Sequence, residues 1–316
     1  MAHAPLNRRR DLILAAAQDY DWAALRPFVE SLRASGYDGE ARFFVSGLSP
    51  TTMELLRESG VEISKPSRAR IRIGRHTFEP YNPSTTRLRW HLQPYVGRAT
   101  RLLAAVSLDR RAAAVRLGGF VSNVDVARYF WYRRYLAPRV HRYRYVMLTD
   151  VRDVVFLASP FSFDIAEDVC VFLENGKLRL RDQTNNRGWL IGAYGQARYE
   201  EIADRPISCS GITIGDAHAV LGYLERMVDE LARLPRQFRG MDQGVHNYLL
   251  HNGRIPRARV VSNEAGPVLT IGTMPEDEAA AALRARGREL TIVHQYDRHA
   301  RLVPEVASLA GVSLDR

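Results

Sequence analysis

One stretch near the middle of the chain limits its possible folds more than any other. Residues 144–149 form a run of strand-like residues that leads into Asp150, and Asp153 follows just before a second short apolar run, residues 154–157. In an open α/β sheet, ligands bind beyond the carboxyl ends of the strands, so we expect both carboxylates at a ligand site. Oxygen ligands there suit Mg²⁺ or Mn²⁺, and such an ion suits a diphosphate. Helix capping or pairing with arginine is the alternative role for these acids.

The chain before this stretch alternates strand and helix patterns. Residues 11–17 have the pattern of a buried strand, and residues 22–32 have the apolar spacing of a helix capped by Asp19 or Asp21. A second strand, a second helix led by Pro50 and a third short strand follow. Such alternation predicts an α/β fold with a mostly parallel central sheet and helices on both faces.

The segments that connect these units to the central stretch are less regular. Residues 68–75 alternate arginine with apolar residues, which is typical of an edge strand or an exposed hairpin, although the charges could also touch an anionic acceptor or a membrane surface. Residues 78–95 predict an irregular loop. A helix that begins near Arg98 is expected to end at Gly118 and Gly119.

Three later segments place polar side chains at the ends of expected elements. Residues 208–215 predict a strand entered through small residues, which let a ligand approach the backbone closely, and a plain core strand is the alternative. Asp242 stands at the start of a helix, and an N-cap, worth about 1 kcal/mol, is the alternative to a role at a site, although the two roles can coexist. A strand over residues 290–294 ends in His294, whose imidazole is an acceptable Mn²⁺ ligand.

Composition and charge narrow the class of protein. The 316 residues are 46% hydrophobic, which suits one large α/β domain, and the net charge is +10, carried almost entirely by arginine. A positive field attracts anions. Because no zinc-ligand pattern, aromatic RNA-binding motif or long basic helix occurs, we expect no nucleic-acid binding. Two cysteines, the lack of a signal-peptide pattern and the lack of the ~18–20 apolar residues of a membrane span predict a cytoplasmic protein, with peripheral membrane association left open.

The central stretch resembles the acidic-motif segment of GT-A-fold glycosyltransferases, the nucleotide-diphospho-sugar transferases. The resemblance rests on residues 148–156 together with Ser159, Pro160 and Phe161. The common motif is Asp-x-Asp, whereas this chain has Asp-x-x-Asp, so which acid dominates metal binding stays open. The order of the other segments is similar to that of glycogenin-like and lipopolysaccharide galactosyltransferase-like enzymes over most of the chain.

This resemblance implies a domain organisation and a reaction. A single GT-A (Rossmann-like) domain would span residues 11–300, with a nucleotide-binding half at 11–157 and an acceptor half at 158–300, between a disordered tail at 1–10 and a C-terminal tail at 301–316. The implied enzyme is a metal-dependent hexosyltransferase. It would move a sugar from a nucleoside-diphosphate sugar to a hydroxyl of a saccharide, lipid-linked sugar or secondary metabolite, and the resemblance favours retention of the anomeric configuration.

The resemblance also assigns roles to residues. Asp150, Asp153 and His294 would hold Mn²⁺ or Mg²⁺. Asp242 and Gln243 would hold sugar hydroxyls beside the reacting carbon, and Asp242 is also the candidate base of an inverting enzyme. The expected donor-binding residues are Ala16, Gln18, Tyr20, Arg128, Asp150, Arg152, Ser210 and Gly211.

Some of these assignments have alternatives. Arg133 could take the place of Arg128 at the donor phosphates, and surface salt bridges are the alternative role for both arginines. Helix capping and packing are the alternatives for the turn after the first strand. The tail segment 295–299 would fold over the diphosphate.

Two other functions remain open at this point. A sugar-phosphate nucleotidyltransferase shares the sheet and the metal-binding acids, but such enzymes usually open with a glycine-rich loop carrying arginine and lysine, and residues 15–19 lack it. A catalytically silent protein that holds a nucleotide-sugar is the other alternative. The presence of both acids, the histidine and the Asp-Gln pair argues against it.

Overall fold

The computed structural model describes residues 9–68, 71–73, 76–78, 102, 106, 109–234 and 238–312. The irregular loop expected at residues 78–95 lies outside this part beyond Phe78. The tail expected at residues 1–10 lies outside it up to residue 8.

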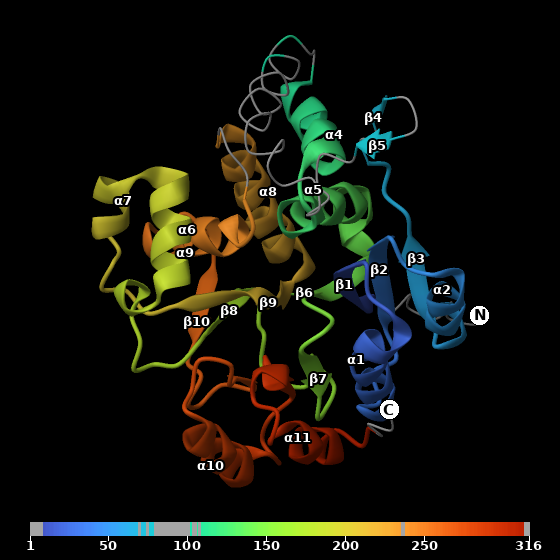
Figure 1. Cartoon of the computed structure of the whole chain (residues 1–316), viewed down its shortest axis with the longest axis vertical. Coiled ribbons are helices and arrows are strands. Elements are labelled where there is room, and N and C mark those ends of the chain that lie inside the picture. The colour runs from blue at the N-terminus through green and yellow to red at the C-terminus, as the bar shows by residue number, and fades with distance from the viewer. Residues whose placement is uncertain are drawn as a thin grey trace, which may run out of the picture.

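Within the described residues, a seven-stranded sheet forms the centre of the molecule (Figure 1). In spatial order its strands are β10 (Ala258–Val261), β8 (Val169–Leu173), β9 (Ser208–Asp216), β6 (Tyr143–Thr149), β1 (Arg10–Gln18), β2 (Glu40–Ser46) and β3 (Val61–Ser64). Strand β9 runs antiparallel to both of its neighbours, and the other neighbouring pairs are parallel. The expected α/β fold with a mostly parallel sheet is confirmed.

Two smaller sheets accompany the central one. The first contains β11 (Val268–Thr270), β12 (Ile292–His294) and β7 (Val154–Phe156), with β12 in the middle. The second is an antiparallel pair, β4 (Ile71–Ile73) and β5 (His76–Phe78). The β4–β5 pair agrees with the hairpin expected near residues 68–75.

Helices cover both faces of the central sheet, as expected (Figure 1). One face packs against α5 (Val124–Leu136), α8 (Ala217–Arg233) and α9 (Met241–His251), and α4 (Arg110–Val121) packs against α5 and α8. Helix α6 (Thr184–Tyr194) lies beside α9, and α7 (Gln196–Glu200) lies beside α6. On the other side of the sheet are α1 (Trp22–Ala34), α2 (Pro50–Glu58), α10 (Glu276–Arg286) and α11 (Val303–Leu309). The described residues also contain the 3₁₀ helices η2 (Ala137–Arg142), η3 (Leu180–Asp182) and η4 (Tyr296–Arg298).

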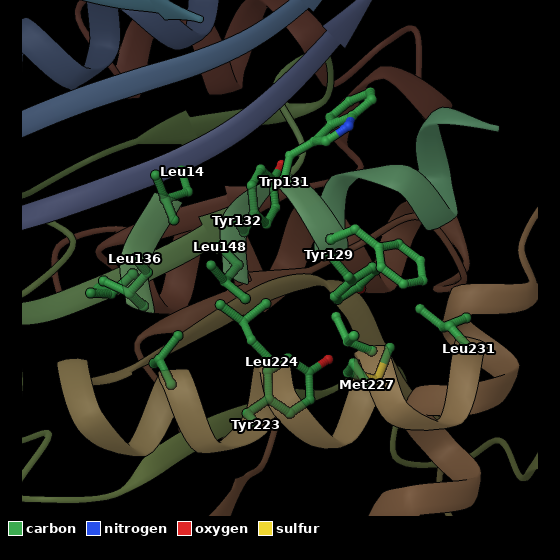
Figure 2. Close-up of a cluster of buried hydrophobic side chains, with 14 of the residues drawn as sticks. Leu14, Tyr129, Trp131, Tyr132, Leu136, Leu148, Tyr223, Leu224, Met227 and Leu231 are labelled. Carbon is green, nitrogen blue, oxygen red and sulfur yellow. The ribbon is translucent and has the colours of Figure 1, made fainter. Parts of the chain in front are cut away.

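The hydrophobic core lies in two layers, one on each face of the sheet. Because successive side chains of a strand point to opposite faces, Leu12 and Leu14 of β1 pack toward α5 and α8, whereas Ile13 packs toward α1. Figure 2 shows the first layer, in which Tyr129 of α5 lies close to Leu224 and its neighbours on α8. Full burial of each large apolar side chain contributes about 1.5–3 kcal/mol, so these layers hold the helices to the sheet.

Local sequence signals set the starts of several helices. The carboxylate of Asp21 accepts a hydrogen bond from the backbone N–H of Ala24 (2.9 Å) at the start of α1, and Asn123 accepts one from Val126 (3.1 Å) at the start of α5. Asp21 is one of the two caps expected from the sequence for its helix. Both side chains act as N-caps because they satisfy backbone donors that the first helical turn leaves unpaired.

The end expected for the helix before α5 is wrong. Gly118 and Gly119 lie inside α4 rather than after it. A Cβ atom at Gly118 would collide with the ring of Phe130, and one at Gly119 would lie 2.9 Å from Trp131. The glycine pair is therefore required by the close approach of α4 to α5, not by a helix end.

No helix among the described residues is both long enough and apolar enough to cross a membrane.

Candidate active site

The pairing of two short strands brings the tail of the chain to the central acidic motif. Strand β7, which directly follows Asp153, pairs antiparallel with β12, and in this register His294 lies opposite Val154. The backbone carbonyl of Asp153 accepts a hydrogen bond from the N–H of Gln295 (2.7 Å). Asp150 lies at the end of β6, where its N–H donates to the carbonyl of Gly211 on β9 (2.8 Å). Backbone hydrogen bonds therefore place all three predicted metal ligands together.

The side chains of Asp150, Asp153 and His294 form one cluster. Each offers a ligand atom within 4.8 Å of the others, so the group could hold a metal ion. The Nε2 atom of His294 lies 3.9 Å from an oxygen of Asp150 and 3.8 Å from an oxygen of Asp153. His294 and Asp153 are buried, whereas the side chain of Asp150 is 37% exposed. The cluster is therefore open to solvent on the Asp150 side.

The donor atoms of the cluster fit a divalent cation. Within the described part of the chain, the buried Nε2 atom of His294 has no hydrogen-bond partner. The other ring nitrogen, Nδ1, lies 3.5 Å from the hydroxyl of Thr270, which can accept a hydrogen bond from Nδ1–H. In this tautomer the Nε2 lone pair faces the two carboxylates. Burial raises the pKa of Asp153, and the charge of Asp150 raises it further. A cation between these groups would offset that repulsion.

A glycine on β9 leaves room for this cluster. A Cβ atom at Gly211 would lie 2.5 Å from an oxygen of Asp150 and 2.8 Å from the His294 ring. Any larger residue would push the two ligands apart. The small residue that the sequence places here is required because two functional side chains approach the backbone.

A buried arginine joins the metal cluster to helix α9. Arg128 of α5 donates through Nη1 to Asp150 and through Nη2 to Asp242, the latter at 2.7 Å. Only 11% of the Arg128 side chain and 6% of the Asp242 side chain are exposed. Burial raises the pKa of Asp242 to about 6 even though the positive charge of Arg128 acts in the opposite direction.

The alternative role considered for Asp242, that of N-cap of its helix, is not what the structure shows. The N-cap is Gly240, which has a left-handed backbone (φ 78°), and its Cα faces the indole of Trp189 with no room for a side chain. Asp242 lies in the first turn of α9 and uses its carboxylate for Arg128 and for the hydroxyl of Ser210 (3.3 Å). A tertiary ion pair thus replaces the local capping bond.

Gln243 is held by a second buried network. Its amide nitrogen donates to Glu174 (3.0 Å) and to Asn186 (3.1 Å), and its amide oxygen accepts from the N–H of Ser210 (3.4 Å). Burial raises the pKa of Glu174. Sequence reasoning did not assign Glu174 or Asn186 to the site, because their link to Gln243 depends on packing between segments far apart in the chain.

A cavity of about 390 Å³ opens beside the metal cluster. Its lining residues are Ala16, Gln18, Asp19, Tyr20, Asn123, Val124, Asp125, Arg128, Asp150, Val151, Arg152, Asp153, Arg239 and Arg298. It lies at the carboxyl ends of β1 and β6, where an α/β sheet is expected to bind its ligand.

The cavity contains most but not all of the predicted site residues. Those that line it are Ala16, Gln18, Tyr20, Arg128, Asp150, Arg152 and Asp153. The remaining five, Ser210, Gly211, Asp242, Gln243 and His294, do not line it but lie behind its wall, where they contact lining residues or one another. The alternative arginine, Arg133, is not a lining residue and instead lies 3.5 Å from Glu225.

Two further arginines line the cavity and were not assigned individually from the sequence. Arg239 precedes α9, and Arg298 lies in η4 of the tail, the segment expected to fold over a diphosphate. Arg152, by comparison, forms an ion pair with Asp297 at 3.1 Å. Together with Arg128, these residues give the cavity four cationic side chains beside its four carboxylates. This mixture suits a phosphate-bearing ligand that binds through both a metal ion and arginines.

No protein-family model matches the chain, and no match was found among curated proteins. Solved structures do resemble it. They include the galactosyltransferase LgtC in complex with donor and acceptor sugar analogs, which is 14% identical over 95% of each chain with a TM-score of 0.46. Core-mannan synthase A from Aspergillus fumigatus, in its Mn/GDP form, is 13% identical over 82% of this chain and 74% of that chain (TM-score 0.41).

A third structure is glucosyl-3-phosphoglycerate synthase from Mycobacterium tuberculosis in complex with Mn²⁺, uridine diphosphate and glucosyl-3-phosphoglycerate. It is 12% identical over 97% of this chain and 81% of that chain, with a TM-score of 0.38. The resemblance to glycosyltransferases that the sequence suggested is thus also found among solved structures. At this level of similarity, function has to be inferred from the side chains of the site itself.

Proposed function

We propose that this protein is a metal-dependent glycosyltransferase that moves a sugar from a nucleoside-diphosphate sugar to a hydroxyl acceptor. The observation that carries the proposal is the convergence of Asp150, Asp153 and His294 at the edge of a cavity that four arginines line. Hard carboxylate oxygens and an imidazole suit Mn²⁺ or Mg²⁺, and arginines beside them suit phosphate oxygens. A nucleoside diphosphate satisfies both requirements at once.

The chemistry assigned to the metal is that of a Lewis acid, which offsets negative charge on the leaving diphosphate. The protein supplies the rest of the electrostatic stabilisation. Arg239 and Arg298 line the cavity and would lie near the phosphates of a bound donor, where cations would stabilise the charge that develops on the leaving group. Arg128 already donates to Asp150 and Asp242, so its direct task is to hold these two carboxylates in place.

The nucleoside would occupy the part of the cavity next to the end of β1. Ala16, Gln18 and Tyr20 line this part. The Gln18 amide is fixed at both ends, because its oxygen accepts from Arg68 (3.0 Å) and its nitrogen donates to Asp19 (2.9 Å). A fixed polar wall of this kind orients a ligand without having to reorganise when the ligand binds.

The contacts of Asp242 and Gln243 favour a retaining reaction. An inverting enzyme needs a carboxylate that can accept the proton of the acceptor hydroxyl. Asp242 is instead engaged by Arg128 and Ser210, and the Gln243 amide is engaged by Glu174 and Asn186. We assign both residues to positioning of the donor sugar. Proton NMR of the newly formed anomeric linkage tests this assignment, because an inverted product would contradict it.

The central experiment is a thermal-shift titration with UDP, GDP and dTDP, each with and without Mn²⁺. We expect one of these nucleotides to raise the melting temperature only when Mn²⁺ is present, because ligand and metal would bind to the same site. Asp153→Asn should abolish the Mn²⁺-dependent shift, and Asp38→Asn, which changes an exposed acid outside the site, should retain it. If none of the nucleotides gives a metal-dependent shift, the proposal is wrong.

Turnover separates an enzyme from a protein that only binds nucleotide-sugars. A transferase releases the free nucleoside diphosphate when an acceptor, or water in its place, takes the sugar. Chromatography of UDP-, GDP- and dTDP-sugars after incubation with protein and Mn²⁺ measures this release. Binding without release, under conditions that saturate the site and with a panel of sugar acceptors, would favour the silent binding protein.

A further inference from the structure

We propose that a second pocket, separate from the metal cluster, binds a phosphate-bearing ligand. This basic pocket has a volume of about 300 Å³ and lies between the end of β3 and the helices α4 and α5. Its lining residues are Phe44, Ser64, Lys65, Pro66, Ser67, Val115, Arg116, Gly119, Phe130, Trp131, Arg134, Tyr135 and Arg139. Four of them are cations, and none of these lining residues, all within the described chain, is an acid.

The cations of the basic pocket lack carboxylate partners. Among the described residues, Lys65, Arg116 and Arg134 form no ion pair, and all three are exposed. Elsewhere on this molecule many arginines are paired, as Arg181 is with Asp204 and Arg257 with Glu167. Like charges that surround one small space repel each other, and an anion bound between them would remove this repulsion.

The fourth cation is held in place by an aromatic side chain. Arg139 donates to the backbone carbonyl of Tyr135 (3.1 Å), and its guanidinium lies 4.7 Å from the centre of the Tyr135 ring. The Tyr135 hydroxyl in turn donates to Glu40 (2.6 Å), which also accepts from Tyr143 (3.0 Å). Glu40 is thus already engaged on the far side of the ring. Such a positioned guanidinium loses little conformational entropy when it binds an anion.

The number and type of these cations favour phosphate over a single carboxylate. A guanidinium offers two parallel N–H groups that match the oxygens of a phosphate or a carboxylate. Three arginines and one lysine around the same pocket supply more positive charge than one carboxylate balances. A phosphate group, with about two negative charges and oxygens that point in several directions, satisfies more of these donors at once.

The basic pocket is connected to the candidate active site through the segment 65–68. Residues 65–67 line the basic pocket and also line a third cavity at the end of β2. Arg68, which lines that third cavity, donates to Gln18 in the wall of the active-site cavity (3.0 Å) and to the carbonyl of Ser122 (2.8 Å). Segment 65–68 therefore lines the basic pocket and the third cavity and contacts the wall of the active-site cavity through Arg68. The basic pocket itself is a separate anion site, whichever reaction the metal cluster performs.

The test is calorimetric titration with inorganic pyrophosphate at low ionic strength in the presence of EDTA, so that the metal cluster is not loaded. The test variant is Arg116→Gln/Arg134→Gln, and both side chains are exposed, which limits effects on folding. The matched control is Arg33→Gln/Arg284→Gln, which removes the same number of charges from exposed positions in the last turns of α1 and α10. Equal melting temperatures of the two variants would confirm that folding is intact.

We expect the wild type and the control to bind pyrophosphate, and the test variant to bind it at least about tenfold more weakly. The loss of even one charge-assisted hydrogen bond of about 1.5 kcal/mol corresponds to a factor of about ten. A lipid headgroup is a second source of the same chemistry. Sedimentation with phosphatidylcholine vesicles, with and without phosphatidic acid, forms the other arm. If only the test variant loses binding to pyrophosphate or to the vesicles, the site is supported. The arm in which binding is lost then identifies the source of the phosphate group. Equal binding by the test and control variants in both arms overturns it.

Discussion

The Nε2 atom of His294 lies 3.8 Å from a carboxylate oxygen of Asp153, and within the described chain it forms no hydrogen bond. A buried polar atom without a partner costs free energy, typically about 1–3 kcal/mol. The protein tolerates this cost at the point where two acids converge on the same space. That combination is expected where a cation completes the set of partners.

Replacement of the histidine should separate metal binding from folding. We expect His294→Leu to weaken Mn²⁺ binding by at least about 10- to 100-fold, since even outer partners of a metal ligand have effects of that size. In EDTA, its free energy of unfolding should change by less than about 2 kcal/mol, because the unpartnered Nε2 atom is removed. Electron paramagnetic resonance of free Mn²⁺ measures the affinity. His218→Leu, at an exposed position, is the control, and equal affinities would refute the metal assignment.

Gly211 offers a test of the same cluster from the backbone side. In Gly211→Ala, the new Cβ atom would lie 2.5 Å from Asp150 and 2.8 Å from His294, so one ligand has to move. We expect weaker Mn²⁺ binding, measured by the same resonance titration, together with a loss of about 1–3 kcal/mol in urea unfolding from overpacking. Gly222→Ala is the matched control: nothing lies within 4 Å of its Cβ, and alanine should stabilise α8 by about 0.5–1 kcal/mol. Unchanged Mn²⁺ affinity in Gly211→Ala would contradict the crowded geometry.

The parts of the fold that could be predicted from the sequence depend on local physics. The buried strand expected at residues 11–17 and the cap Asp21 depend on residues a few positions apart, and the structure confirms them. The metal cluster could be predicted only with the help of the family resemblance. Nothing in the local sequence indicates that β12 pairs with β7, the step that brings His294 to the acids.

The errors came from tertiary contacts that override local patterns. Gly118 and Gly119 have the pattern of a helix end, but glycine is required at position 118 because α4 lies directly against the ring of Phe130. Asp242 matches an N-cap by position, but a buried arginine takes its carboxylate. Glu174 and Asn186 have no spacing that links them to Gln243, so their network appears only in three dimensions.

Removal of the buried arginine should destabilise the protein through the carboxylates that it leaves behind. We expect Arg128→Met to lower the free energy of unfolding by about 3–5 kcal/mol, because Asp242 would remain as a buried charge without its partner. Adding Asp242→Asn to this variant should recover part of the loss. Urea unfolding of the two single variants and the double variant measures the coupling. Strictly additive losses would show that the two side chains do not act as a pair.

The buried His246 should make stability depend on pH. Its two ring nitrogens form hydrogen bonds with the hydroxyls of Ser208 and Tyr223 (both 2.9 Å). Burial lowers the pKa of His246 from 6.5 to about 3. Below pH 6.5 the unfolded chain binds a proton at this residue and the folded chain does not, so stability falls as the pH falls from 6.5 toward 3. At pH 5 the loss is about 2 kcal/mol relative to neutral pH, at about 1.36 kcal/mol per pH unit.

The matched variant for this effect is His246→Gln, which retains a side chain able to hydrogen bond but cannot titrate in this range. It should be less stable than the wild type at pH 7.5, because it fits the Ser208 and Tyr223 positions less well. Between pH 7.5 and pH 5, however, its free energy of unfolding should fall by about 2 kcal/mol less than that of the wild type. Since other titrating groups, such as the partly buried His251, are the same in both proteins, the difference in slope belongs to His246. If urea unfolding shows the same change of free energy with pH for both proteins, the imidazole binds its proton as readily in the folded protein as in the unfolded chain, which would contradict this prediction.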